Sequence, residues 1–263
     1  MNYYSWIDSE EAEKVCTGGT GDDGDGGTIN IATEISNNGY YSVPVGNNIV
    51  ENIVFDTTSS LIEIGNYING QYTYNYYDDI GGWSVGLTDR ESTDPVTTNN
   101  LCTTVNNQPI VSMSGMFEKS SVTTIDLNGI DTSNVTDMSH MFYESHATTL
   151  DLSSFDTSNV TDMHSMFYGS AATTLDLSSF DTSNVRRMEG MFRFATNLTT
   201  IYVSSNFTTN SVTDSGLMFS GASNLVGGNG TTYNASYVNK VRAVIDTAST
   251  PGYFTDIADK PSS

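Results

Sequence analysis

The chain has 263 residues, and 31 Asp and Glu residues against 9 Lys and Arg residues give it a formal net charge of −22. So few cations cannot neutralise a run of phosphates, and a strongly negative field repels nucleic acids and anionic lipid surfaces. The charge excludes a general polyanion binder. Hydrophobic residues make up 37% of the chain, which is enough to form a core.

No apolar stretch reaches the roughly 18 residues that a transmembrane helix requires. Met1 leads into Asn2–Trp6, which lacks the basic start and apolar stretch of a signal peptide. We therefore expect neither direct membrane insertion nor an export signal in this sequence.

Residues 1–105 carry 16 acids and 2 bases, a net charge of −14, against −8 for the remainder. Asp8, followed three residues later by Glu11, predicts a capped helix over residues 8–16. The glycine-rich residues 17–27 predict a loop.

Three carboxylates make that loop a weak Ca²⁺ candidate: Asp22, Asp23 and Asp25. The segment lacks the bidentate Glu that closes an EF-hand, so a solvated linker is the alternative. We expect no other cofactor and no other metal site.

Strands are predicted at about 28–35, 40–45 and 49–55. Asn69-Gly70 predicts a hairpin between Glu63–Ile68 and Gln71–Tyr77. We therefore expect residues 1–105 to form a small, mainly antiparallel β domain that serves attachment or oligomerisation.

This half also holds an aromatic cluster and both cysteines. Tyr72, Tyr74 and Tyr76 share one face of a strand and suit an interface, with core packing as the alternative. Cys16 and Cys102 allow one disulfide that closes a loop of about 85 residues, although two free thiols fit the count equally well.

A 25-residue period organises the rest of the chain. A long identical stretch, LDLSSFDTSNV, starts at Leu150 and returns at Leu175. The Met and Phe residues that recur at this interval are expected to fill the core. They are Met113, Met138, Met163 and Met188, and Phe117, Phe142, Phe167 and Phe192.

Each unit contains T-T-[IL]-D-L, whose alternation predicts a short strand, and V-x-x-M-x-x-M-F, whose spacing predicts a helical or 3-10 segment. The predicted fold class is therefore α+β: a leucine-rich-repeat-like solenoid preceded by the small β domain. We expect the repeat array over residues 106–224 and a C-terminal cap and tail over residues 225–263.

The units resemble the BspA-like leucine-rich repeats of bacterial surface proteins, also found in mycoplasma surface lipoproteins, which run L-x-x-L-D-L-S-x-F-D-T-S-N-V-T-x-M-x-x-M-F. LVGGNGTTY from Leu225 and the segment from Val241 to Thr255 are similar to the cap of such arrays. The resemblance spans about residues 110–257. It implies attachment to proteins or cells, an extracellular location and no enzymatic activity.

Stacked strands would expose a polar face with an acidic stripe, which could bind a protein or a glycan. Its residues are Thr124, Asp126, Thr149, Asp151, Ser153, Thr174, Asp176 and Ser178. A merely solvated face is the alternative reading. A second column, Asp131, Asp156 and Asp181, is expected to cap the following segment by side-chain to backbone hydrogen bonds, as are Asn134, Asn159 and Asn184.

The cationic group Arg186, Arg187 and Arg193 could contact an acidic partner or a neighbouring subunit, or serve solubility. The three His residues have different repeat phases, which argues against a zinc site. No nucleophile motif appears, so we expect no catalytic residues.

Two functions therefore remain open. The first is a surface-exposed adhesion or recognition protein that binds a protein or glycan on a host or neighbouring cell. The second is a virion or appendage decoration protein, a fibre-like homo-oligomer attached through residues 1–105.

Overall fold

The structure of the chain is a computed structural model. It divides into two compact units, one made of residues 1–88 and 99–112 and the other of residues 89–98 and 113–263. The structure describes residues 20–22, 28–30, 40–41, 44–45, 48–49, 53–54, 66–69, 71–77, 80–98, 101–105 and 108–261.

The first unit contains a five-stranded sheet with the order β10-β11-β9-β8-β7. All its neighbouring pairs are antiparallel except β11 with β9. The strands are β7 (Asn66–Asn69), β8 (Tyr72–Tyr77), β9 (Gly82–Leu87), β10 (Thr104–Val105) and β11 (Gln108–Ser112). Trp83 is buried in this sheet, and its Nε1 donates to the Val105 carbonyl at 3.0 Å.

The predicted hairpin is confirmed, because β7 and β8 pair antiparallel, but Asn69 is itself paired, opposite Tyr72, so the turn begins one residue later than predicted. Short strands precede this hairpin in the chain. They are β1 (Thr20–Asp22), β2 (Thr28–Asn30), β3 (Tyr40–Tyr41), β4 (Pro44–Val45), β5 (Asn48–Ile49) and β6 (Ile53–Val54). Because β1 lies within residues 17–27, the prediction of a loop there is wrong for residues 20–22. The predicted helix over residues 8–16 lies outside the described residues.

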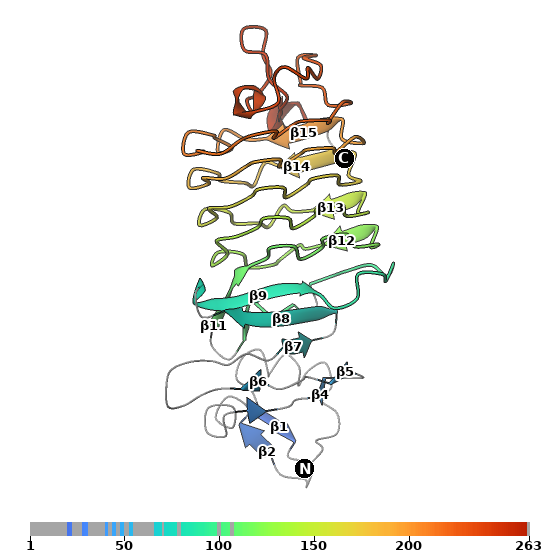
Figure 1. The fold of residues 1–263 in the computed structure, drawn as a ribbon, viewed down its shortest axis with the longest axis vertical. Helices are drawn as coiled ribbons and strands as arrows, with labels where there is room; N and C mark the ends of the chain where they lie inside the picture. Colours follow the sequence, from blue (N-terminus) through green and yellow to red (C-terminus); the bar gives the residue numbers. More distant parts are fainter. Residues whose placement is uncertain are drawn as a thin grey trace. The chain divides into compact units, whose positions relative to one another are not determined.

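The second unit is a stack of coils of about 25 residues, each with one short parallel strand (Figure 1). The strands form two parallel sheets, β12-β13 and β14-β15-β16. They are β12 (Thr124–Asp126), β13 (Thr149–Asp151), β14 (Thr174–Leu177), β15 (Thr200–Val203) and β16 (Thr255–Asp256). Short 3-10 helices lie at η2 (Lys240–Arg242) and η3 (Ile257–Asp259).

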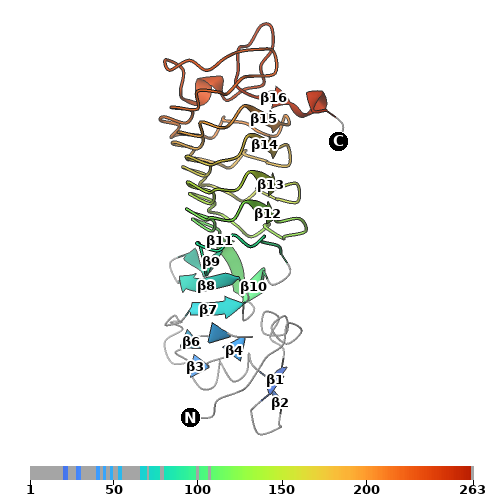
Figure 2. The same ribbon diagram turned by 90° about the vertical axis from the view of Figure 1, so that its right-hand side faces the viewer.

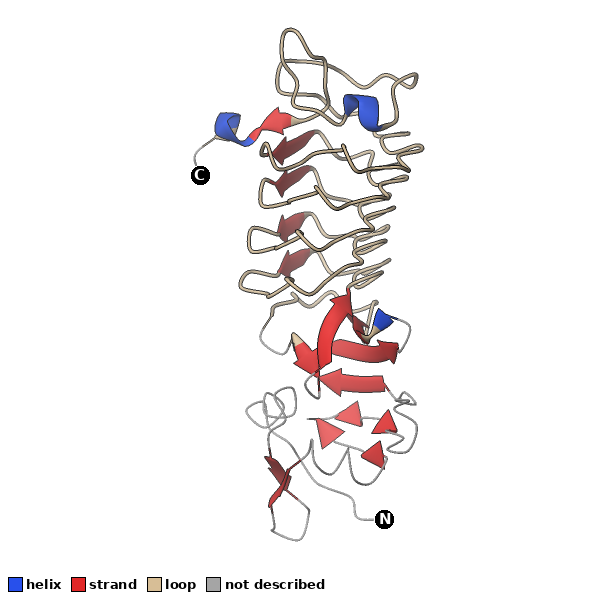
Figure 3. Cartoon of the chain, turned by 90° about the vertical axis from the view of Figure 1, so that its left-hand side faces the viewer, coloured by secondary structure: helices blue, strands red, loops and turns tan. Residues whose placement is uncertain are grey.

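The α+β fold class is wrong, because the V-x-x-M-x-x-M-F segments are loops and turns (Figure 3), and the described residues contain 3-10 helices but no α-helix. A helix would satisfy every N–H four residues back in its own segment. Here the amides of Met138, His140 and Phe142 donate to the next coil, and only the amides between them form local turns. His140 adopts a left-handed φ of 54°, which also interrupts a helix.

The apolar spacing nevertheless has a structural role, since each tight turn returns a side chain to the interior. Met138, Met141 and Phe142 are 0% exposed, and the Met and Phe residues at equivalent positions of the other coils are at most 1% exposed. The prediction that the Met and Phe columns fill the core is confirmed.

A buried carboxylate organises the C-terminal end of the stack. Asp246 accepts hydrogen bonds from the amides of Asn229, Thr231 and Gly252 and from the Thr231 hydroxyl, at 2.7–3.1 Å. Burial raises the pKa of Asp246, but these hydrogen bonds outweigh it and hold the pKa below its ordinary value.

In the part of the chain that the structure describes, no helix is long and apolar enough to cross a membrane.

Candidate functional site

The exposed residues of the repeat strands lie on one polar side of the stack, which we call the strand face. Thr124 lies opposite Thr149, and Asp126 lies opposite Asp151, in the register of β12 and β13. All four are exposed, whereas Ile125 between them is 1% exposed. Thr174 is exposed on β14, and Asp176, Ser153 and Ser178 continue the surface, with Ser153 exposed and the other two half-buried. The structure thus brings all eight predicted residues onto one side of the stack.

Parallel pairing places equal charges on neighbouring strands, where like charges repel. The repulsion is offset locally, because each Asp accepts a hydrogen bond from the amide two residues later, at Asn128, Ser153 and Ser178. The Ser153 hydroxyl and amide lower the pKa of Asp151 below its ordinary value, against opposing effects of burial and of Asp176. Asp151 therefore stays ionised at neutral pH.

The stripe ends at a cation and an aromatic ring that sequence reasoning missed. Tyr202 takes the place of the Asp on β15, opposite Asp176. Lys260 donates from Nζ to Asp176 Oδ2 at 2.5 Å, and its Nζ lies 5.9 Å from the centroid of the Tyr202 ring. Tyr202 comes 26 residues after Asp176, which hides it from a strict 25-residue comparison, and no periodic signal marks Lys260.

A family model described as "Mycoplasma protein of unknown function, DUF285" matches residues 111–228 and, in an overlapping match, residues 146–252. The two matches together cover more than half of the chain. The chain belongs to the DUF285 family. No curated protein and no solved structure matches the sequence.

The DUF285 matches contain β12 to β15 and therefore most of the strand face, but they stop before β16 and Lys260. The BspA-like resemblance noted in the sequence concerns the same repeats. The family description assigns no function, so the role of the strand face has to be inferred from its geometry.

The second Asp column has a structural role, as predicted. Asp131, Asp156 and Asp181 each accept the amide two residues later, from Ser133, Ser158 and Ser183, at 2.9–3.0 Å. Asn159 and Asn184 donate to backbone carbonyls of the preceding coil, at Ser133 and Ser158. These hydrogen bonds confirm the prediction for the Asp column, whereas Asn159 and Asn184 bind the preceding coil and do not cap the segment that follows them.

The arginines lie away from the strands. Arg187 occupies the column of Asp137, Asp162 and Asp214, and its Nη1 lies 2.7 Å from Asp162 Oδ2. Arg187 thereby separates two like charges, which explains its presence within the repeat. Arg186 is exposed, and Arg193 lies 4.8 Å from the centroid of the exposed Phe194 ring.

Two of the three tyrosines predicted as an interface are buried in the first unit. Tyr72 and Tyr74 are 0% exposed, and the Tyr74 hydroxyl accepts from the Cys102 amide at 2.7 Å, so both rings pack in the interior. The Tyr76 side chain lies outside the described residues. Cys102 is buried and disulfide-bonded, while Cys16 and the side chains of the Ca²⁺ candidates Asp22, Asp23 and Asp25 also lie outside them.

Histidine and carboxylate side chains also meet on the turns. His164 Nδ1 lies 2.7 Å from Asp162 Oδ1, and the His140 and His164 rings meet edge to face with centroids 4.4 Å apart. Within the described residues, no group of three or more His, Cys, Asp or Glu side chains has a geometry that could hold a metal ion.

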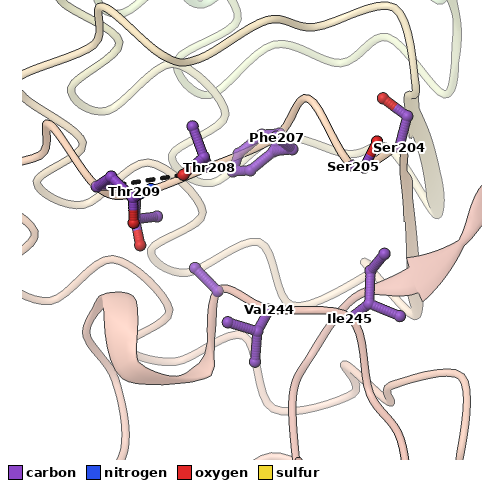
Figure 4. Close-up of a pocket in the computed structure, with 9 residues that line it drawn as sticks. Ser204, Ser205, Phe207, Thr208, Thr209, Val244 and Ile245 are labelled. Atoms are coloured by element: carbon purple, nitrogen blue, oxygen red, sulfur yellow. Dashed lines mark hydrogen bonds between the residues drawn. The ribbon is translucent and has the colours of Figure 1, made fainter.

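A shallow, open hollow of about 260 Å³ lies near the C-terminal end of the stack (Figure 4). Phe207 forms part of it, together with the hydroxyl residues Ser204, Ser205 and Thr208, and Val244 and Ile245 lie on the other side. It contains no titratable side chain, so it offers hydrogen bonds but no acid–base chemistry. The strand face is exposed and charged, and it is therefore the stronger candidate for binding.

Proposed function

We propose that the chain is a non-enzymatic, surface-exposed recognition module whose strand face binds a protein, cell-surface or glycan partner. The observation that supports this most is the exposed, in-register ladder of Thr124 with Thr149 and of Asp126 with Asp151. Membership of DUF285 and the BspA-like resemblance are compatible with a surface role. The proposal needs no cofactor.

Rigidity favours recognition by this face. In the core of the stack, the Phe rings of successive coils stack with centroids 5.4–5.8 Å apart. Backbone hydrogen bonds also join each coil to the next. A preorganised surface loses little conformational entropy on binding. Thr and Asp side chains are short, so ordering them costs less than ordering long side chains would.

An array of extracellular-matrix proteins and glycans tests the proposal. We expect the wild-type protein to bind at least one component, and Asp151→Lys combined with Thr149→Tyr to reduce that binding about tenfold or more, because the change reverses charge at the centre of the face. Asp131→Lys is the matched control, since Asp131 forms the same kind of turn and has the same charge but lies off the strands. Equal losses in the strand-face and control variants would reject the strand face as the site.

A further inference from the structure

The C-terminal segment is firmly held at its start. Phe254 is 0% exposed and packs against Phe207 and Phe219, with ring centroids 4.9 and 5.9 Å apart. Directly after it, β16 adds to β15 as a parallel strand, with Thr255 opposite Tyr202. The chain therefore leaves the core at a fixed point beside the strand face.

Beyond β16 the segment is exposed. Asp256 caps η3, whose three residues include none that is buried, and residues 258–261 are all exposed. Figure 2 shows η3 projecting from the end of β16, away from the stacked coils. Lys260 reaches back past β15 to Asp176 on β14. We call residues 257–260 the strap.

The contact at the tip of the strap is exchangeable. The side chains of Lys260 and Asp176 are 44% and 33% exposed. Ion pairs at such exposure contribute little to stability and are screened by salt. Burial raises the pKa of Asp176, but hydrogen bonds from Lys260 and Ser178 outweigh it and lower the pKa below its ordinary value. Asp176 is thus a charged partner that another cation could use.

The contact also indicates which chemistry the face accepts. A carboxylate at 2.5 Å and an aromatic ring at 5.9 Å together suit an ammonium group, which gains both a charge-assisted hydrogen bond and a cation–π interaction. Asp151 and Asp126 continue the acidic stripe on the next strands and bear the same sign as the chain's net charge of −22. A partner segment with several lysines complements this row.

We propose that the strap is autoinhibitory: Lys260 holds, within the chain, the position on Asp176 and Tyr202 that a lysine side chain of a protein partner takes on binding. This inference rests on the proposed binding role of the strand face. It adds the partner's chemistry, a lysine-bearing segment, and a regulatory contact that the partner must displace.

Binding of a synthetic hexalysine peptide at low salt tests the strap, using the full chain and its variants. Lys260→Met should lower the apparent Kd about twofold to sixfold, the competition expected from one exposed ion pair. Lys119→Met is the matched control. Lys119 is also an exposed lysine beside a carboxylate, Glu118 at 3.9 Å, and an aromatic ring, Tyr143 at 5.7 Å, but it lies outside the strands. It should leave the Kd within about twofold of wild type.

A third variant separates the two proposals. Asp151→Asn in the Lys260→Met background should weaken binding of the peptide. If Asp151→Asn weakens binding but Lys260→Met does not tighten it, the strand face binds cations and the strap proposal is wrong. If Lys260→Met and Lys119→Met tighten binding equally, general charge explains the gain and the strap is again rejected. Absence of binding to every variant would overturn the lysine specificity.

Discussion

Phe142 and Phe167, equivalent residues of neighbouring coils, stack with ring centroids 5.4 Å apart and planes 6° apart. Phe167 also stacks on Phe192, at 5.8 Å. Phe167→Ala should therefore lower the free energy of unfolding by about 3–5 kcal/mol, through lost burial and a cavity between coils. Urea unfolding measures this. The control Phe194→Ala removes a ring that is 44% exposed and should lower the free energy of unfolding by less than about 1 kcal/mol. Similar losses in the two variants would contradict a core built on the stacked Phe rings.

Thr157 joins two coils through a buried hydroxyl. It is 1% exposed, and its Oγ1 donates to the Asp181 carbonyl at 2.9 Å. Thr157→Val keeps the shape but leaves that carbonyl without this donor, so we expect a loss of about 1–3 kcal/mol in unfolding free energy. Thr157→Ser retains the hydroxyl and should recover much of the loss in the same urea titration. A valine variant as stable as wild type would contradict a role for this hydrogen bond.

Asp246 is the electrostatic anchor of the C-terminal end. Asp246→Asn should lower the free energy of unfolding by about 2–4 kcal/mol at pH 7, because an amide cannot accept all the hydrogen bonds that the carboxylate accepts. Asp214→Asn, at an exposed hydrogen bond to Gly216, is the control and should change it by about 0.5 kcal/mol or less.

The same carboxylate predicts a pH dependence. The pKa of Asp246 is lower in the folded chain than its ordinary value of 3.8, so its stabilising effect is present above that pH and is lost as the pH falls through the folded pKa. The stability gap between wild type and Asp246→Asn should therefore shrink below about pH 4. A gap that stays constant down to the folded pKa and below would contradict the hydrogen-bonded carboxylate.

His140 predicts a second pH effect at milder acidity. Burial and the neighbouring His164 lower the pKa of His140 from 6.5, against opposing effects of Glu118, Asp137 and Asp162. The folded state thus disfavours the charged imidazole, and stability should decline as the pH falls below about 6.5. Thermal unfolding of His140→Gln should show a smaller decline between pH 7 and 5, whereas the exposed His146→Gln should follow wild type. Identical profiles for all three proteins would contradict this effect.

The sequence predicts the columns of the second unit well, because a fixed period forces equivalent residues into equivalent positions. It predicts the buried Met and Phe residues, the Asp131 column of turns and the hairpin of β7 and β8, although not its exact turn. The helical prediction for V-x-x-M-x-x-M-F is wrong, because apolar residues three apart fit a helix and a series of tight turns equally well. The hydrogen bonds from the amides of Met138, His140 and Phe142 to the next coil, together with the left-handed φ of His140, distinguish the two.

The strand face was only partly predictable for a related reason. Repetition identifies Asp126, Asp151 and Asp176, but Tyr202 breaks the period. Lys260 meets Asp176 across 84 residues of sequence, through a tail whose position depends on β16 adding to β15. Local patterns contain no information about such a contact.

Carboxylate footprinting tests the central claim, that the strand face is the binding surface, most directly. Asp126 and Asp151 on the face and Asp131 and Asp156 on the turns are all exposed, so a carbodiimide reagent can label all four. With the strongest-binding component of the matrix and glycan array present, labelling of Asp126 and Asp151 should fall severalfold while Asp131 and Asp156 stay unchanged. Protection of Asp131 and Asp156 with undiminished labelling of Asp126 and Asp151 would contradict the account.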